Sequence, residues 1–187
     1  MTYKQLIKNW HTKASNEDYF SKFMFEYLAF MAHLRTQRYT TSNNDRDVLQ
    51  LLKNDNELKD AYFQKTGVRE AYIALKSELD DVRLGNASGL RTVEEIQWWN
   101  HICRADSFCG AHGCGDIPDG LQSFEDEMKG RLYGEQDWAN LIELWRAVRD
   151  NLFHGSKNPD VLRDQKMVEF GHKTLQPLVE ILITEQL

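Results

Sequence analysis

The chain has 187 residues, a length that suits one compact domain with a full hydrophobic core. Hydrophobic residues make up 41% of it and charged residues 28%, with only 11 glycines and 3 prolines, which excludes a disordered, collagen-like or low-complexity chain. The net charge of -6 argues against a broad basic surface that grips DNA or RNA through many phosphates, so any RNA contact must be local.

The sequence predicts neither a membrane helix nor a secretory signal. The longest apolar stretch, residues 23–32, is interrupted by Glu26 and is far shorter than the roughly 20 residues that span a bilayer. The first residues are polar and amphipathic and lack an apolar segment with a small-residue cleavage site. Three cysteines, an odd number, fit a reducing compartment in which thiols stay free. We therefore expect a cytoplasmic protein.

Helix-forming residues dominate between short polar breaks, and no segment has the alternation of a strand, so the expected fold class is all-α. We expect one domain over residues 1–187, and a final helix that Pro177 kinks or divides. The predicted helices cover 3–13, 19–38, 46–53, a short segment from 57, 68–84, a segment from 92, 137–154, and a segment from 158 onward.

The segment 19–38 is the most apolar of these helices. A polar segment with capping residues, 15–18, precedes it. Its apolar side chains recur at steps of three and four and form one wide stripe, which predicts burial at the centre of the fold: Tyr19, Phe20, Phe23, Tyr27, Phe30, Met31 and Leu34. Arg35 and Arg38 follow this stripe and are expected to be solvated at the helix end, with a place beside a ligand cleft as the alternative.

Periodicity disappears at about 105–120, where glycines cluster, so this segment is predicted to be an irregular insertion. Such segments serve as lids, partner surfaces or small metal sites. Cysteine and histidine, which are typical zinc ligands, are frequent in and near this segment. Their spacing matches no common zinc knuckle, so we expect no metal and no cofactor. The alternative is a zinc ion held by Cys103, Cys109, His112 and Cys114.

The helix predicted over 137–154 carries the residues with the clearest chemistry. Arg149 lies at the edge of an apolar stripe, and a guanidinium there needs a carboxylate, a carbonyl or a ligand phosphate. Asp150 and His154 are four residues apart and share a face while the helix continues, so the carboxylate can support an imidazolium. The alternative is structural: His154 is favoured by the helix dipole, and Arg149 pairs with an interior glutamate.

The run Arg149-Asp150-Asn151-Leu152-Phe153-His154-Gly155-Ser156-Lys157 resembles the signature of the HEPN superfamily, in which an Arg is followed directly by a polar residue and, one turn later, by a His. The aromatic helix from Asp18 to Leu34 also resembles the early core helix of these proteins. The resemblance implies a bundle of four or more helices with additional short ones. It also implies a homodimer that places two motifs across one cleft.

In many HEPN proteins that cleft cuts RNA without a metal, and the resemblance implies the same here, in a toxin or phage-defence system with a cognate antitoxin or partner protein. His154 would remove the proton of an RNA 2'-hydroxyl, and Arg149 would hold the phosphate. Asp150 and Asn151 would orient neighbouring groups, and Lys157 is a further candidate for substrate binding. The alternative is a HEPN-like module that binds a nucleotide or a protein without catalysis.

Other enzyme classes lack support in the sequence. It contains no Gly-x-Ser-x-Gly elbow for a serine hydrolase. No strand precedes a glycine-rich segment of the kind that cradles phosphates.

Overall fold

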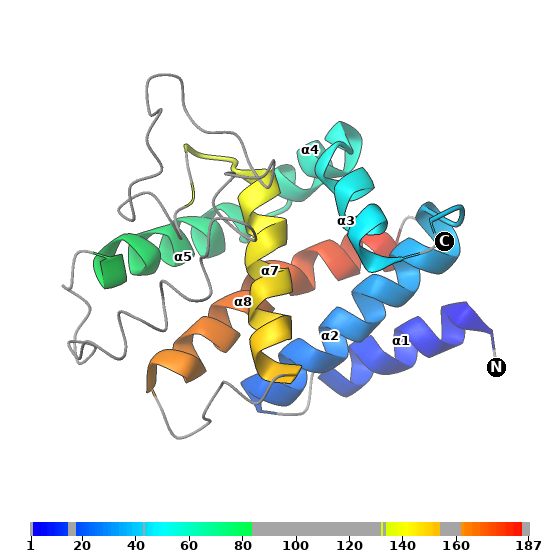
Figure 1. Cartoon of the computed structure of the whole chain (residues 1–187), viewed down its shortest axis with the longest axis horizontal. Coiled ribbons are helices and arrows are strands. Elements are labelled where there is room, and N and C mark those ends of the chain that lie inside the picture. The colour runs from blue at the N-terminus through cyan, green and yellow to red at the C-terminus, as the bar shows by residue number, and fades with distance from the viewer. Residues whose placement is uncertain are drawn as a thin grey trace. The chain divides into compact units, whose positions relative to one another are not determined.

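The computed structural model describes residues 2–14, 18–42, 44–83, 132, 134–153 and 162–184. Within these residues every regular element is a helix, which confirms the all-α prediction (Figure 1). The elements in chain order are α1 (Tyr3–Ala14), α2 (Tyr19–His33), η1 (Leu34–Arg38), α3 (Asp45–Lys53), α4 (Asn56–Gln64), α5 (Val68–Arg83), α7 (Trp138–Phe153) and α8 (Leu162–Thr184). No helix among the described residues is both long and apolar enough to cross a membrane.

The chain forms two compact units. The first comprises Met1–Arg69 together with Lys157–Leu187, and the second comprises Glu70–Ser156. The first unit therefore contains α1 to α4 and α8, and the second contains most of α5 and all of α7. That residues 1–187 make up one domain stays a prediction.

In the first unit, α2 lies against both α1 and α8 (Figure 1). Its apolar side chains form much of the core. The helix begins where predicted, because the Asp18 carboxylate accepts hydrogen bonds from the backbone N–H groups of Phe20 and Ser21, at 2.8 and 3.2 Å. Burying each large side chain of this stripe stabilises the fold by about 2 kcal/mol. The fully buried ones include Phe23, Phe30 and Leu34.

The helix predicted over 19–38 continues to Arg38, but its last turn widens into the π-helix η1. The backbone N–H of Tyr39 donates to the carbonyl of Leu34, five residues earlier, at 2.7 Å. The expectation that Arg35 and Arg38 are solvated is wrong for Arg38, whose side chain is only 22% exposed and donates to Asp55 at 2.7 Å. Arg35 is about half exposed and pairs with Asp45 at 3.2 Å.

Helix α8 is not divided at Pro177, although a proline inside a helix removes one backbone hydrogen bond. Packing holds both halves in place, because Leu175 and Leu178 on either side of the proline are fully buried. The hydroxyl of Tyr62 on α4 also donates to the carbonyl of Thr174 at 2.6 Å. Tertiary contacts of this kind outweigh the local effect of the proline.

In the second unit, α5 meets the beginning of α7 through a buried tyrosine. The Asp137 carboxylate accepts from the backbone N–H of Asn140 at 3.2 Å and so caps the start of α7. The backbone N–H of Asp137 in turn donates to the hydroxyl of Tyr72 on α5, at 2.9 Å. Along α7, Trp138 and Trp145 are buried and meet edge to face, with ring centroids 5.9 Å apart.

Candidate functional site

The last turn of α7 carries the part of the predicted site that the structure describes. Most of this helix is buried through Leu141, Trp145 and Val148, all of which are fully covered. Arg149 and Asp150 lie where this burial ends, with side chains 34% and 35% exposed. The helix thus has a buried body and brings two oppositely charged side chains to a partly exposed end.

Arg149 is held in place on two sides. Its Nη1 donates to Oδ1 of Asp150 at 2.7 Å, a charge-assisted hydrogen bond of good length. Its guanidinium carbon lies 4.5 Å from the ring centroid of Phe153, in cation–π contact. Phe153 is itself 57% exposed, which is unusual for so large an apolar side chain. An oriented guanidinium and an exposed aromatic ring therefore lie together at this end of α7.

A second arginine, Arg146, lies between Asp150 and a buried glutamate nearer the middle of α7. Arg146 donates from Nε to Oε2 of Glu143 at 2.7 Å, and its Nη1 lies 3.8 Å from Oδ2 of Asp150. Glu143 is only 5% exposed, so this buried glutamate has an arginine as its partner. Ion pairs thus connect Glu143 to Arg146, Arg146 to Asp150, and Asp150 to Arg149, and the formal charges of these four residues balance.

The remaining predicted residues are not brought into this arrangement by the structure. His154 and Lys157 lie outside the described residues, as does the side chain of Asn151. The structure therefore joins Arg149 to Asp150 and leaves the role of His154 as a prediction.

Sequence reasoning missed Phe153 and Arg146 at this site, although the spacing contained the signal. Phe153 follows Arg149 by four residues, and Arg146 precedes Asp150 by four, so each pair shares a helix face. The spacing of Asp150 and His154 is the same.

No metal site is evident in the part of the chain that the structure describes, where no three His, Cys, Asp or Glu side chains are grouped to hold an ion. The alternative zinc ligands Cys103, Cys109, His112 and Cys114 lie outside the described residues, as does the predicted insertion at about 105–120.

The arrangement at the end of α7 suits recognition of a nucleotide. A guanidinium matches the oxygens of a phosphate, and an exposed aromatic ring offers a face on which a base can stack. Comparison of the chain with protein-family models, curated proteins and solved structures finds no match.

Proposed function

We propose that this chain is a HEPN-like, metal-independent endoribonuclease that cuts RNA by attack of a 2'-hydroxyl on the adjacent phosphate. One observation supports the proposal most directly: Arg149 is held by Asp150 and stacked on exposed Phe153 at the end of α7. Arg149 is the arginine of the HEPN-like motif, and Asp150 is the polar residue directly after it. His154, the histidine of the motif, follows Phe153 directly in the sequence.

In the proposed reaction, His154 accepts the proton of the 2'-hydroxyl as that oxygen bonds to phosphorus. The bond from phosphorus to the 5'-oxygen breaks, leaving a 2',3'-cyclic phosphate on one fragment and a 5'-hydroxyl on the other. Arg149 binds the phosphate and stabilises the charge that develops on its oxygens. Asp150 keeps the guanidinium oriented, and Phe153 stacks against a neighbouring base.

The leaving 5'-oxygen takes a proton from His154 of a second copy, whose imidazole is in the protonated form. The chain therefore acts as a homodimer in which two motifs face one RNA strand. The proposal extends to a cytoplasmic toxin or phage-defence component that a cognate antitoxin or partner protein restrains.

The test uses the purified full chain and mixed cellular RNA in the presence of a chelator. We expect cleavage that leaves cyclic phosphate ends and that falls at least about a hundredfold in His154→Ala, the usual scale of a lost general base. Arg149→Ala is expected to lose activity comparably, through lost stabilisation of the phosphate. Lys76→Gln on α5 is the control, since it removes one positive charge from the same unit outside the site and should keep full activity. Cleavage that persists undiminished in His154→Ala would reject the proposal.

The alternative is a non-catalytic module that binds a nucleotide or a protein. The bond between Arg149 and Asp150 favours it, because a guanidinium that already has a carboxylate can serve structure alone. Binding of RNA fragments by the wild-type chain that Arg149→Ala weakens, with no cleavage under any condition, would select this alternative.

A further inference from the structure

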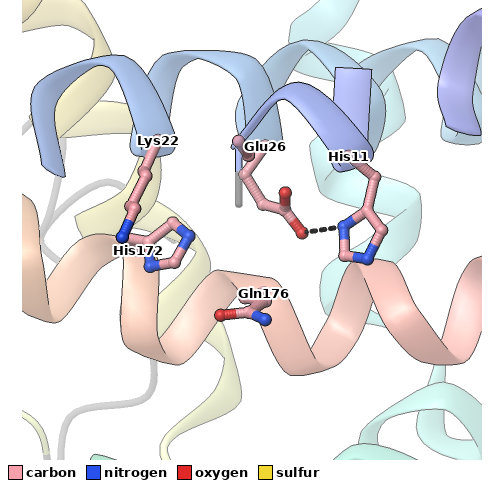
Figure 2. Close-up of a pocket in the computed structure, with 6 residues that line it drawn as sticks. His11, Lys22, Glu26, His172 and Gln176 are labelled. Atoms are coloured by element: carbon pink, nitrogen blue, oxygen red, sulfur yellow. Dashed lines mark hydrogen bonds and ion pairs between the residues drawn. The ribbon is translucent and has the colours of Figure 1, made fainter. Parts of the chain in front are cut away.

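A cavity of about 240 Å³ lies within the first unit, among α1, α2 and α8. Its volume is several times the roughly 30 Å³ that a water molecule takes up in the liquid, so it has room for a small organic molecule. The residues that line it are His11, Ala14, Lys22, Glu26, His172 and Gln176. Figure 2 shows Lys22 and His172 close together at one end, Glu26 between the helices, and His11 at the other end.

The three helices bring these residues together through ordinary helical spacing. Lys22 and Glu26 are four residues apart on α2, so both project from one face toward α8 (Figure 2). His172 and Gln176 are likewise four residues apart on α8. His11, on the last turn of α1, completes the group.

Two buried polar atoms of residues that line this cavity lack hydrogen-bond partners among the described residues. Glu26 is fully buried, and its Oε1 lies 2.7 Å from Nδ1 of His11, but its Oε2 has no hydrogen-bond partner there. His172 is 7% exposed, and its Nδ1 has none either. Buried polar atoms are nearly always paired, so two such atoms at one cavity leave hydrogen bonds for whatever fills the cavity to complete.

The charges at the cavity leave one positive group without a carboxylate. The hydrogen bond to Glu26 raises the pKa of His11 above 6.5 against the effect of burial, and burial raises the pKa of Glu26. The two side chains therefore share one proton and together have zero net charge. Burial, with the nearby charge of Lys22, lowers the pKa of His172 to about 4, so this imidazole is neutral. The ammonium of Lys22 contacts the Tyr19 ring, at 5.0 Å from its centroid, but no carboxylate of the described residues.

The neighbouring charges are already paired. Lys173 bonds to Glu169, while Glu180 bonds to Lys65 at 3.0 Å and accepts from Gln176 at the same distance. The cavity therefore combines a cation that needs an anion with a buried carboxylate that needs a donor. A metal ion does not fit this combination, because no three ligating side chains of the described residues are grouped to hold one.

We propose that the cavity binds a small carboxylate that also carries an amino or hydroxyl group, the chemistry shared by free α-amino acids and α-hydroxy acids. The ligand's carboxylate pairs with Lys22. Its amino or hydroxyl group donates to Oε2 of Glu26, and Nδ1 of His172 bonds a second polar atom. This site uses none of the residues of the proposed nuclease, so either proposal can fail while the other stands.

The test first measures whether the standard amino acids and their hydroxy-acid counterparts bind to the full chain. Calorimetry or ligand-detected NMR monitors the binding. At least one compound is expected to bind saturably, with a dissociation constant below about 10 mM. The same compound without its amino or hydroxyl group, or without its carboxylate, should bind about tenfold more weakly, since each loses one charged hydrogen bond. Each amino acid is compared with the hydroxy acid that has the same side chain. The tighter binder of the two identifies the amino or the hydroxyl group as the donor to Glu26.

Three variants test whether the compound binds in this cavity. Lys22→Gln and Glu26→Gln should each weaken binding of that compound by about tenfold or more. Lys8→Gln removes an exposed lysine of α1 that does not line the cavity, and it should bind like the wild type. Thermal unfolding checks that each variant is folded. Absence of binding to the wild type by every compound, or equal binding to a folded Lys22→Gln protein, would overturn the proposal.

Discussion

At the scale of single residues, two histidines of the first unit have pKa values that move in opposite directions. The hydrogen bond that His11 donates to the Glu26 carboxylate raises the pKa of His11, whereas burial lowers the pKa of His172 to about 4. His11 therefore stabilises the fold at a pH below 6.5, and this stabilisation is lost as the pH rises through its folded pKa. His172 acts in the opposite sense, because it must be neutral in the folded state, and its stabilisation is lost as the pH falls below 6.5.

Since these two effects oppose each other near pH 6.5, a melting curve cannot separate them, and NMR titration of the imidazoles is the better measurement. We expect His11 to titrate above 6.5 and His172 near 4. In Glu26→Gln the pKa of His11 should fall below 6.5, because burial remains and the carboxylate is gone. His172 should be unchanged, and so should His11 in Glu57→Gln, which alters an exposed glutamate of α4. An unchanged pKa of His11 in Glu26→Gln would contradict the assigned pairing.

The sequence contained a sign of this cluster, since Glu26 interrupts the longest apolar stretch of the chain. A charged residue within a buried stripe requires a partner from another element. The partner could not be chosen from the sequence, because His11 lies fifteen residues away on another helix. The bond between Arg149 and Asp150 lies within one helix, but the sequence pointed to His154 as the partner of Asp150 and left the partner of Arg149 open.

At the scale of elements, Asp55 connects the end of η1 to the start of α4. Its carboxylate accepts from Nε of Arg38 at 2.7 Å and from the hydroxyl of Tyr39 at 2.6 Å. It also caps α4 by accepting from the backbone N–H of Leu58 at 3.0 Å. Burial alone would raise the pKa of Asp55, but these hydrogen bonds outweigh it and hold the pKa below 3.8.

Asp55→Ala removes the cap and both tertiary hydrogen bonds, so we expect it to lower the free energy of unfolding by about 3 kcal/mol. Asp60→Ala, at an exposed position of the same helix, should change it by less than about 0.5 kcal/mol. Urea unfolding at neutral pH measures the free energy of unfolding of both variants.

Because the folded pKa of Asp55 is lowered, the stability that its carboxylate contributes is present above about pH 4 and is lost as the pH falls further. Equal stability of the two variants would show that Asp55 does not join these elements.

Helical periodicity and capping residues predicted most of the described helices to within a few residues, from α1 to α7. They worked because each depends on side chains within one helix. The widening at η1 was not predicted, and of the two expected effects of Pro177, a kink or a division of the helix, the division is absent. Both depend on other parts of the fold, since Arg38 bonds to Asp55 and the residues around Pro177 are held by packing and by Tyr62.

At the scale of the whole molecule, the charge balance limits how the RNA of the proposed function could be bound. The chain carries a net charge of -6, and the two arginines near the end of α7 face two carboxylates, Glu143 and Asp150. A protein with this balance cannot neutralise a long run of phosphates. We therefore expect RNA binding to depend on one or two phosphates at Arg149 and on stacking against Phe153.

Salt dependence measures this directly, because the logarithm of the association constant falls by about 0.7 per neutralised phosphate for each logarithmic unit of salt on single strands. A 2'-O-methylated oligonucleotide serves as the ligand, since it lacks the attacking hydroxyl and is not consumed. We expect a slope of about -1 for the wild-type chain, reduced by about 0.7 in Arg149→Gln and unchanged in Lys76→Gln. A slope steeper than about -3 would mean that four or more phosphates are bound, and it would require a basic surface that the net charge argues against.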